Sequence, residues 1–333
     1  MKFLVTGGSG FVGQHMINRV LQGGHEVVAM IRDFEKISSL IDILGEENIK
    51  KIKFVYGDLT NHNSIIEVFL KYKFDGVFHL AAMAHPPTAF NNPLLAYQIN
   101  SVGTAIICDS ILEHQPQCVL MQCSTPAVYG RCPIDKKLDE TTPINPNIPY
   151  GTSKASADLY VIERALNKNL RCFLTRAFTH AGPGRPENFC ISSDAAQISR
   201  ILLGYQEPVI KIGNMESLRT IIDVRDVADA YYSLMIEYLK GVVPNCEVFH
   251  IAGNELKKMQ YYLDIMLELF GLADKVKLEI EPKYYRKNDN SAQIPDDSKI
   301  RRLINWEPKI KIEKTLQDLV DYWLNKLQKR EEL

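Results

Sequence analysis

A regular alternation between two kinds of segment fills the first half of the chain and leaves few folds open to it. Short apolar runs rich in β-branched residues are followed by longer segments with the apolar period of a helix. Strands are expected at 3–6, 27–31, 53–56, 77–80, 119–123 and 170–175, and helices at 11–21, 64–72, 93–112 and 150–167. Strands that are apolar on both faces need helices on each side. The alternation therefore predicts an α/β fold with a doubly wound parallel sheet that binds ligands at the carboxyl ends of its strands.

The pattern loosens after Arg176, where a stretch rich in Gly and Pro precedes shorter elements. Further helices are expected near 194–203, 226–239, 257–270 and 312–328. We therefore expect one domain over residues 1–176 and a smaller one over residues 177–333. Two later strands, 209–212 and 248–251, are candidates to return to the first domain.

Charge and cysteine content exclude several classes of partner. Lys+Arg 39 against Asp+Glu 40 gives 39 − 40 = −1, so no general field attracts nucleic acid or an acidic membrane. No apolar run approaches the length of a membrane helix. The seven cysteines include no Cys-x-x-Cys pair, which argues against a metal site. Their odd number, without a secretory segment, favours reduced thiols in a cytoplasmic protein.

A glycine-rich turn follows the first expected strand and opens the first expected helix. Glycines stand at Gly7, Gly10 and Gly13, with Phe11 and Val12 between the last two. Glycine permits a tight turn and lets backbone N–H groups approach a pyrophosphate at the positive end of the helix dipole. A tight turn without a ligand is the alternative, but the strand–turn–helix context favours a dinucleotide cofactor.

The end of the second strand bears on which cofactor binds. NAD binding uses an acidic side chain there, whereas this chain has Ile31 and Arg32, and a guanidinium suits the 2′-phosphate of NADP. NADP(H) is therefore favoured and NAD(H) remains possible; Arg32 could instead pair with Asp33. Asp58, followed by Leu59, is placed to face the adenine or to cap a helix.

Tyr150 and Lys154 are the candidate proton-transfer pair. An offset of four residues places them on one face of a helix. A tyrosine pKa is ordinarily about 10, and a neighbouring ammonium favours the phenolate. We therefore expect Lys154 to lower the pKa of Tyr150 and make it a usable acid or base. The same pair is also expected to contact the cofactor.

The strand at 119–123 delivers two hydroxyls, Ser124 and Thr125, to the same edge of the sheet. Either could hydrogen-bond a carbonyl oxygen and orient it toward Tyr150. Cys123 precedes them, but no histidine stands at a recognisable spacing, so a buried thiol is the better interpretation.

These motifs together resemble the extended short-chain dehydrogenase/reductase family. The glycine turn, Leu80-Ala81-Ala82, Asn100-Ser101-Val102-Gly103-Thr104, the Ser124-Thr125 segment with Val128-Tyr129-Gly130, and Tyr150-x-x-x-Lys154 occur in the family's order. The resemblance implies a Rossmann-type domain that binds cofactor near Leu80, Ala81 and Ala82. In that family the catalytic hydroxyl lies four residues before the tyrosine of the Tyr-Gly pair, so the resemblance assigns that role to Thr125. It also implies a homodimer, formed through helices 93–112 and 150–167; the alternative is that the apolar faces of these helices are buried within one chain.

The second half resembles GDP-4-keto-6-deoxy-mannose reductases and GDP-mannose 4,6-dehydratases. The resemblance rests on 176–184, 212–214, 223–227 and 305–308. It implies that Asn214, Arg219 and Arg286 contact a nucleotide diphosphate, which a guanidinium fork suits; Arg225 is expected to form a surface ion pair. Further substrate contacts are expected from Ser124, Thr125, Thr179 and Asn188. The chain departs from the reductase pattern at two places. Thr179 stands where the reductases commonly have an Asn before the His, and residues 185–189 resemble the dehydratases more than the reductases.

The predicted function is NADPH-dependent reduction of the C4 keto group of a nucleotide-linked 4-keto-6-deoxy-hexose, with GDP favoured. Dehydration needs a carboxylic acid close behind the threonine, and Pro126 and Ala127 stand there. A 4-epimerase is the alternative, because the same residues can oxidise C4 and return the hydride to the other face. A 4,6-dehydratase or a cofactor-binding protein without activity is disfavoured.

Overall fold

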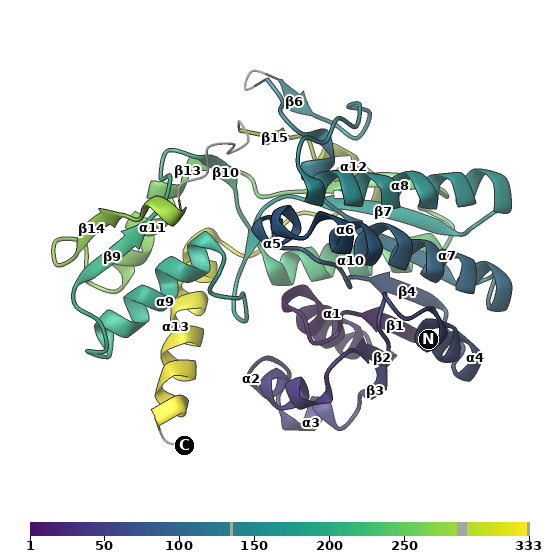
Figure 1. Ribbon diagram of the computed structural model, residues 1–333, viewed down its shortest axis with the longest axis horizontal. Coiled ribbons are helices and arrows are strands. Elements are labelled where there is room, and N and C mark those ends of the chain that lie inside the picture. The colour runs from purple at the N-terminus through teal and green to yellow at the C-terminus, as the bar shows by residue number, and fades with distance from the viewer. Residues whose placement is uncertain (134–135, 285–291, 332–333) are drawn as a thin grey trace.

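A seven-stranded parallel sheet is the centre of this computed structural model, which describes residues 1–133, 136–284 and 292–331 (Figure 1). Its strand order is β12-β7-β5-β4-β1-β2-β3. The strands are β1 (Lys2–Thr6), β2 (Glu26–Ile31), β3 (Lys53–Tyr56), β4 (Gly76–His79), β5 (Val119–Ser124), β7 (Cys172–Ala177) and β12 (Glu247–Ile251). The order runs outward from β1 in both directions, which confirms the predicted doubly wound α/β fold.

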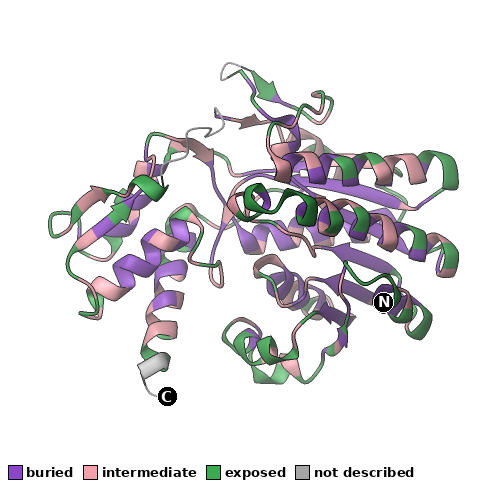
Figure 2. Ribbon diagram, viewed as in Figure 1, coloured by how far each residue is buried: buried purple, intermediate pink, exposed green. Residues whose placement is uncertain are grey.

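Helices cover both faces of the sheet because successive strand residues point to opposite sides. Phe3 and Val5 of β1 pack into a core that includes α1 and α10, whereas Leu4 packs into a second core with α4, α7 and α8. The bounds are α1 (Phe11–Gln22), α4 (His62–Lys71), α7 (Gly103–His114), α8 (Pro149–Lys168) and α10 (Val224–Leu239). Figure 2 shows the sheet strands buried between these layers.

Short elements occupy the connections of the main sheet. They are η1 (Phe34–Leu40), α2 (Ile41–Leu44), α3 (Glu46–Ile49), α5 (Pro86–Asn91), η3 (Pro126–Tyr129), β6 (Lys137–Leu138), β15 (Ile294–Pro295) and α12 (Ser298–Ile304). The expected helix 93–112 is divided into α6 (Pro93–Tyr97), one π-helical turn η2 (Gln98–Val102) and α7. A π turn inside a helix often marks a functional position.

A smaller lobe stands beside the carboxyl edge of the sheet (Figure 1). Its apolar core joins α9 (Cys190–Leu202), α11 (Met259–Leu269) and α13 (Ile312–Glu331). Its other elements are β8 (His180–Ala181), β9 (Val209–Ile212), β10 (Leu218–Thr220), β11 (Ile222–Asp223), β13 (Leu256–Lys258), β14 (Lys277–Ile280) and η4 (Pro282–Tyr284). Within the described ranges, no helix combines the length and apolar character needed to cross a membrane.

The two expected strands at 209–212 and 248–251 join different sheets. Glu247–Ile251 joins the main sheet as β12, parallel to β7. Val209–Ile212 does not return to that sheet; it pairs with β14 in the smaller lobe. The expectation for 209–212 was therefore wrong, because an apolar strand of this length carries no mark of the sheet it will join.

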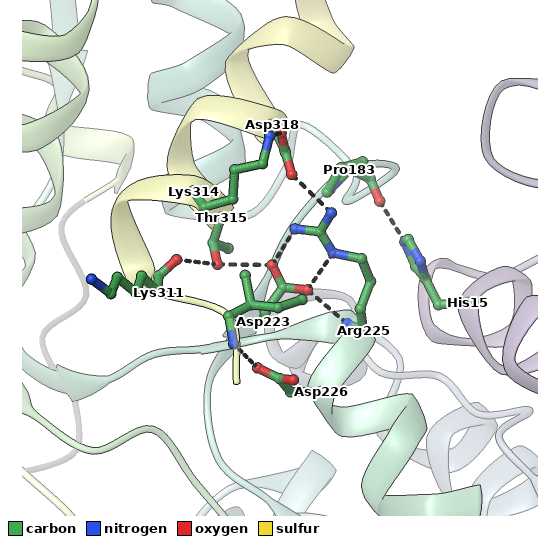
Figure 3. A network of polar contacts seen from close by, with 10 residues as sticks. His15, Pro183, Asp223, Arg225, Asp226, Lys311, Lys314, Thr315 and Asp318 are labelled. Carbon is green, nitrogen blue, oxygen red and sulfur yellow. Dashed lines mark hydrogen bonds and ion pairs between the residues drawn. The ribbon is translucent and has the colours of Figure 1, made fainter. Parts of the chain in front are cut away.

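Arg225 connects the two parts of the molecule (Figure 3). It follows β11 at the start of α10, and its guanidinium bonds Asp223 at 2.7 and 2.8 Å and Asp318 of α13 at 2.8 Å. Thr315 donates to the other side of the buried Asp223 carboxylate at 2.8 Å. The expected ion pair of Arg225 is thus half-buried, and it joins α13 to the first turn of α10.

Candidate functional site

The glycine turn between β1 and α1 is packed too closely for any side chain. Gly7 has φ +67°, and a Cβ there would lie 2.9 Å from the Ala81 backbone. A Cβ on Gly13 would lie 2.1 Å from the Gly7 carbonyl oxygen. Gly10 precedes α1 and supplies no side-chain cap, so the first N–H groups of the helix, on Phe11 and Val12, face no capping side chain. This cradle fits a pyrophosphate at the helix N-terminus.

A hydrogen-bond chain that sequence reasoning missed holds the neighbouring strand ends. The Leu80 and Ala81 N–H groups both donate to Thr6 Oγ1 at 3.1 Å, and Thr6 bonds His79 Nδ1 at 2.8 Å. His79 Nε2 continues the chain to Thr104 at 3.1 Å. Burial lowers the pKa of His79 to about 3, so the ring is neutral. Leu80, Ala81 and the following Ala82 are thereby held beside the glycine turn.

Arg32, Asp58 and Leu59, which are predicted to lie near the adenosine half of the cofactor, have different environments. Arg32 is exposed directly after β2 and, among the described residues, has no ion pair with Asp33, which caps η1 through the Glu35 N–H. Asp58 accepts from the Thr60 N–H and hydroxyl at 2.8 and 2.9 Å, and Leu59 is buried. Asn61, rather than Asp58, caps α4. Arg32 therefore keeps its charge available for a ligand.

Tyr150 and Thr125 come together where β5 ends and α8 begins. The Thr125 hydroxyl interacts with the Tyr150 phenol. Thr125 also accepts from the Ala127 N–H at 3.3 Å. Burial raises the pKa of Tyr150, and the bond to Thr125 opposes this rise only in part. The expectation that Lys154 would lower this pKa below its ordinary value is contradicted, because desolvation of the phenol dominates.

Lys154 lies one turn along α8 from Tyr150, as the spacing predicted. Its buried ammonium donates to the Cys123 carbonyl at 2.5 Å. Burial lowers the pKa of Lys154, while the charges of Cys123 and Asp158 raise it. Burial also raises the pKa of the Cys123 thiol, which matches an inert thiol better than a nucleophile.

Ser124 is tied to a buried ion pair behind the site. Its hydroxyl donates to Asp158 at 2.7 Å, so that proton is already engaged within the protein. The expected contact of Ser124 with substrate stays a prediction. Arg176 of β7 bonds the same carboxylate oxygen at 3.1 and 3.3 Å. Arg176 also donates to Tyr129 at 2.7 Å, and Tyr129 bonds His250 of β12 at 2.5 Å. These buried contacts fix the loop that carries Thr125.

Asn100, in the π turn, anchors the catalytic helix from the other side. Its amide exchanges hydrogen bonds with the Met83 backbone at 2.8 and 3.2 Å. It also donates to Ser153 at 3.0 Å, and Ser153 donates to the Tyr150 carbonyl at 2.9 Å. The sequence carries this residue in a motif, but the contact with α8 arises only in the fold.

A cavity of about 780 Å³ lies between the carboxyl edge of the sheet and the smaller lobe. Four residues predicted to bind substrate line it, namely Thr179, Asn188, Asn214 and Arg219. The structure therefore brings these residues together from separate loops. Arg286 lies outside the described residues.

Arg185 also lines this cavity and was not predicted as a site residue. Its guanidinium lies over the rings of Phe11 and Phe189, 5.3 and 4.3 Å from their centres, and donates to the His180 carbonyl. Burial lowers the pKa of Arg185 to about 10. A guanidinium between the glycine turn and the cavity suits a phosphate group. The Gly-Pro-rich stretch was the available signal.

The glycine turn, the Tyr150–Lys154 pair and the two-lobed α/β architecture define an extended short-chain dehydrogenase/reductase. The model of the family described as GDP-mannose 4,6 dehydratase matches residues 4–319, and the chain belongs to this family. Its relatives comprise dehydratases, epimerases and reductases that modify nucleotide sugars.

Individual relatives extend over nearly the whole chain. GDP-6-deoxy-D-mannose reductase of Pseudomonas aeruginosa is 27% identical over 97% of this chain and 97% of its own length. CDP-paratose 2-epimerase of Salmonella typhi is 25% identical over 97% of this chain and 99% of its own. RMD from Pseudomonas aeruginosa, solved in complex with NADPH, shares the fold with a TM-score of 0.81 and 22% identity, covering 98% and 99% of the two chains.

Proposed function

We propose that this protein is an NADPH-dependent reductase of the C4 keto group of a nucleotide-linked 4-keto-6-deoxy-hexose, with GDP-4-keto-6-deoxy-mannose as the favoured substrate. The observation that carries the proposal is the interaction of the Tyr150 and Thr125 hydroxyls where β5 ends, with Pro126 and Ala127 where a dehydratase needs an acid. The carboxylate nearest to this pair along α8, Asp158, is bound by Ser124 and Arg176. The relative GDP-6-deoxy-D-mannose reductase supports the same reaction.

The glycine turn, Arg32 and the backbone at Leu80 and Ala81 would hold the dinucleotide. When bound, NADPH supplies the hydride that reduces C4. The Thr125 hydroxyl orients the C4 oxygen, and Tyr150 donates the proton that completes the alcohol. Lys154 holds the end of β5 through Cys123 and contributes positive charge as the phenolate forms. Arg32 is the feature that supports NADP(H) over NAD(H), because structural neighbours were solved with either cofactor, NADPH in RMD and NAD in the UDP-glucose 4-epimerase of Thermus thermophilus.

The protonation state of Tyr150 is compatible with the proposed reduction. Because burial raises its pKa, the phenol keeps its proton at neutral pH. A reductase uses the phenol first as an acid, whereas a 4-epimerase must first use it as a base to oxidise the C4 alcohol. The ligand-free arrangement is therefore ready for the first of these reactions.

Incubation of the purified protein with GDP-4-keto-6-deoxy-mannose and NADPH tests the proposal. Reduction predicts one NADPH consumed for each product formed, followed by nicotinamide absorbance and product mass. A changed stereoisomer of a 4-hydroxy sugar without net NADPH consumption would identify an epimerase. Loss of water from GDP-mannose would identify a dehydratase, and either result would overturn the proposal.

A further inference from the structure

Asp194, in the second turn of α9, is a buried carboxylate without a strong partner. It is 3% exposed and lines the 780 Å³ cavity. It accepts one weak hydrogen bond, from the Cys190 thiol at 3.8 Å. Burial raises the pKa of Asp194 to about 7. Leaving such a group in the fold is costly unless a ligand or another group meets it.

The other buried aspartates in the described part of the chain each have a charged or hydrogen-bonding partner. Asp158 is met by Ser124 and Arg176. Asp223 is met by Arg225 and Thr315. Asp226 accepts from a backbone N–H at 2.9 Å. Asp194 differs from all three, because neither a cation nor an N–H or O–H donor reaches it in the described part of the chain.

The fold places Asp194 in the smaller lobe, on a different element from the catalytic pair. One turn later on α9, Gln197 bonds both backbone groups of Lys211, at 2.8 and 3.1 Å, and so fixes α9 against β9. The loop after β9 brings Asn214 to the same cavity. Figure 1 shows α9 and β9 in the smaller lobe, while Tyr150 belongs to α8 over the main sheet.

The charge of Asp194 excludes the diphosphate as its partner. Arg185 and Arg219 line the same cavity and suit phosphate oxygens, which a carboxylate would repel. In a nucleotide sugar the sugar and the base lie on opposite sides of the diphosphate. With the sugar at Tyr150, the base is the group that reaches α9.

We propose that Asp194 reads the Watson–Crick edge of the nucleobase and selects guanine. An ionised carboxylate has two acceptor oxygens and no donor. Guanine presents two adjacent donors, N1–H and the 2-amino group, whereas uracil and thymine present one donor between two carbonyl oxygens. The inference rests on the proposed function, which it deepens by naming the residue that chooses the nucleotide.

Calorimetric titration of the wild-type protein and the Asp194→Asn variant with GDP and IDP, in mildly alkaline buffer, tests this assignment. IDP lacks only the 2-amino group. The wild type is expected to bind IDP about 10- to 100-fold more weakly than GDP, the loss of one hydrogen bond to a charged acceptor. In Asp194→Asn that ratio should fall toward one. XDP should then bind better than GDP, because the amide can donate to its 2-carbonyl.

Asp264→Asn, the same change at an exposed position of α11 outside the cavity lining, is the matched control and should keep the wild-type ratio. If Asp194→Asn discriminates GDP from IDP as well as the wild type does, the assignment is overturned. The wild-type ratio needs no variant, so equal binding of GDP and IDP would overturn it even if Asp194→Asn misfolds. The reductase assay is separate: guanine selection without NADPH consumption would refute the reduction and leave the role of Asp194 standing.

Discussion

At the residue scale, burial decides the chemistry of the catalytic groups. Tyr150, Lys154 and Asp158 recur every four residues on one face of α8, and each has its pKa shifted by desolvation against its charged form. The three shifts have one cause, because this face of the helix packs on β5 and β7 rather than meeting water. A proton donor, an ammonium and a carboxylate that supports the loop are thus set side by side.

Replacing Tyr150 by Phe removes the acidic hydroxyl and keeps the ring. We expect kcat to fall by about 100- to 10,000-fold, the usual worth of a positioned general acid. NADPH affinity, measured by fluorescence titration, should change little, because the glycine turn is untouched. Turnover at the wild-type rate would show that another group donates the proton.

Replacing Asp158 by Asn leaves the Arg176 guanidinium buried without a countercharge. Removal of one partner of a buried ion pair is expected to lower the free energy of unfolding by about 3–5 kcal/mol, measured by urea denaturation. Glu47→Gln, which breaks the exposed pair with Lys50, is the control and should cost less than about 1 kcal/mol. Equal effects of the two variants would contradict the structural role of Asp158.

At the element scale, polar side chains between strands and helices determine how the edge of the sheet is assembled. His79 joins β1, β4 and the segment after the π turn through Thr6 and Thr104. Asn100 then joins that segment to α8. The side chains of Thr6, His79 and Thr104 hydrogen-bond one another in series, so the cofactor side of the sheet is held by directional contacts as well as by apolar packing.

The neutral His79 ring makes stability depend on acid pH in a definite direction. Its pKa is about 3 when folded, against 6.5 ordinarily, so its contribution is present above pH 6.5 and is lost as the pH falls toward 3. Within that window the free energy of unfolding should fall by up to about 1.4 kcal/mol per pH unit from this residue. His79→Gln should show a shallower dependence in denaturation series, and His62→Gln, on the exposed start of α4, should not. Identical slopes for His79→Gln and the wild type would refute this.

The outer surfaces of α6 and α8 carry the proposed homodimer contact. Leu94 is 84% exposed, and Leu159 and Leu166 are also exposed. Changing Leu94 and Leu159 together to Asp is expected to convert a dimer to a monomer in light scattering, because each buried leucine contributes about 1.5–3 kcal/mol. Leu70→Asp, an equally apolar exposed position on α4, should leave the dimer intact. A monomeric wild type would disprove the dimer.

At the scale of the whole molecule, the cavity depends on how the smaller lobe is joined to the sheet. Arg225 connects α10 to α13 through Asp223 and Asp318, and His15 of α1 bonds the Pro183 carbonyl at 2.8 Å in the loop before α9 (Figure 3). These contacts orient the cavity wall that carries Asn188 and Asp194 relative to the catalytic pair.

Arg225→Ala should therefore weaken substrate binding more than cofactor binding. We expect a higher KM for the sugar nucleotide, an unchanged Kd for NADPH and a loss of about 2 kcal/mol in the free energy of unfolding, because Asp223 stays buried with fewer partners. Lys314→Ala breaks an exposed pair with the same Asp318 and should cost no more than about 0.5 kcal/mol. A rise in KM for Lys314→Ala as large as for Arg225→Ala would contradict the role of the junction.

Much of this protein was readable from local sequence. Gly7, Gly10 and Gly13 mark a turn whose backbone conformation and close packing exclude side chains, and the alternating periods predict the parallel sheet. The four-residue offset of Tyr150 and Lys154 places them on one helix face. These properties depend on backbone geometry over a few residues, so they survive without knowledge of the rest of the chain.

Other features were decided by tertiary structure alone. The pairing of 209–212 with β14 and the hydrogen bond from Ser124 to Asp158 each join segments that are far apart in the sequence. The burial of Asp194 in the cavity also depends on residues from several distant segments. The pKa of Tyr150 is the clearest case: the nearby ammonium was visible in the sequence, but the desolvation that outweighs it was not. The burial of a residue and its hydrogen-bond partners depend on all of its neighbours in space. The sequence by itself shows only the neighbours along the chain.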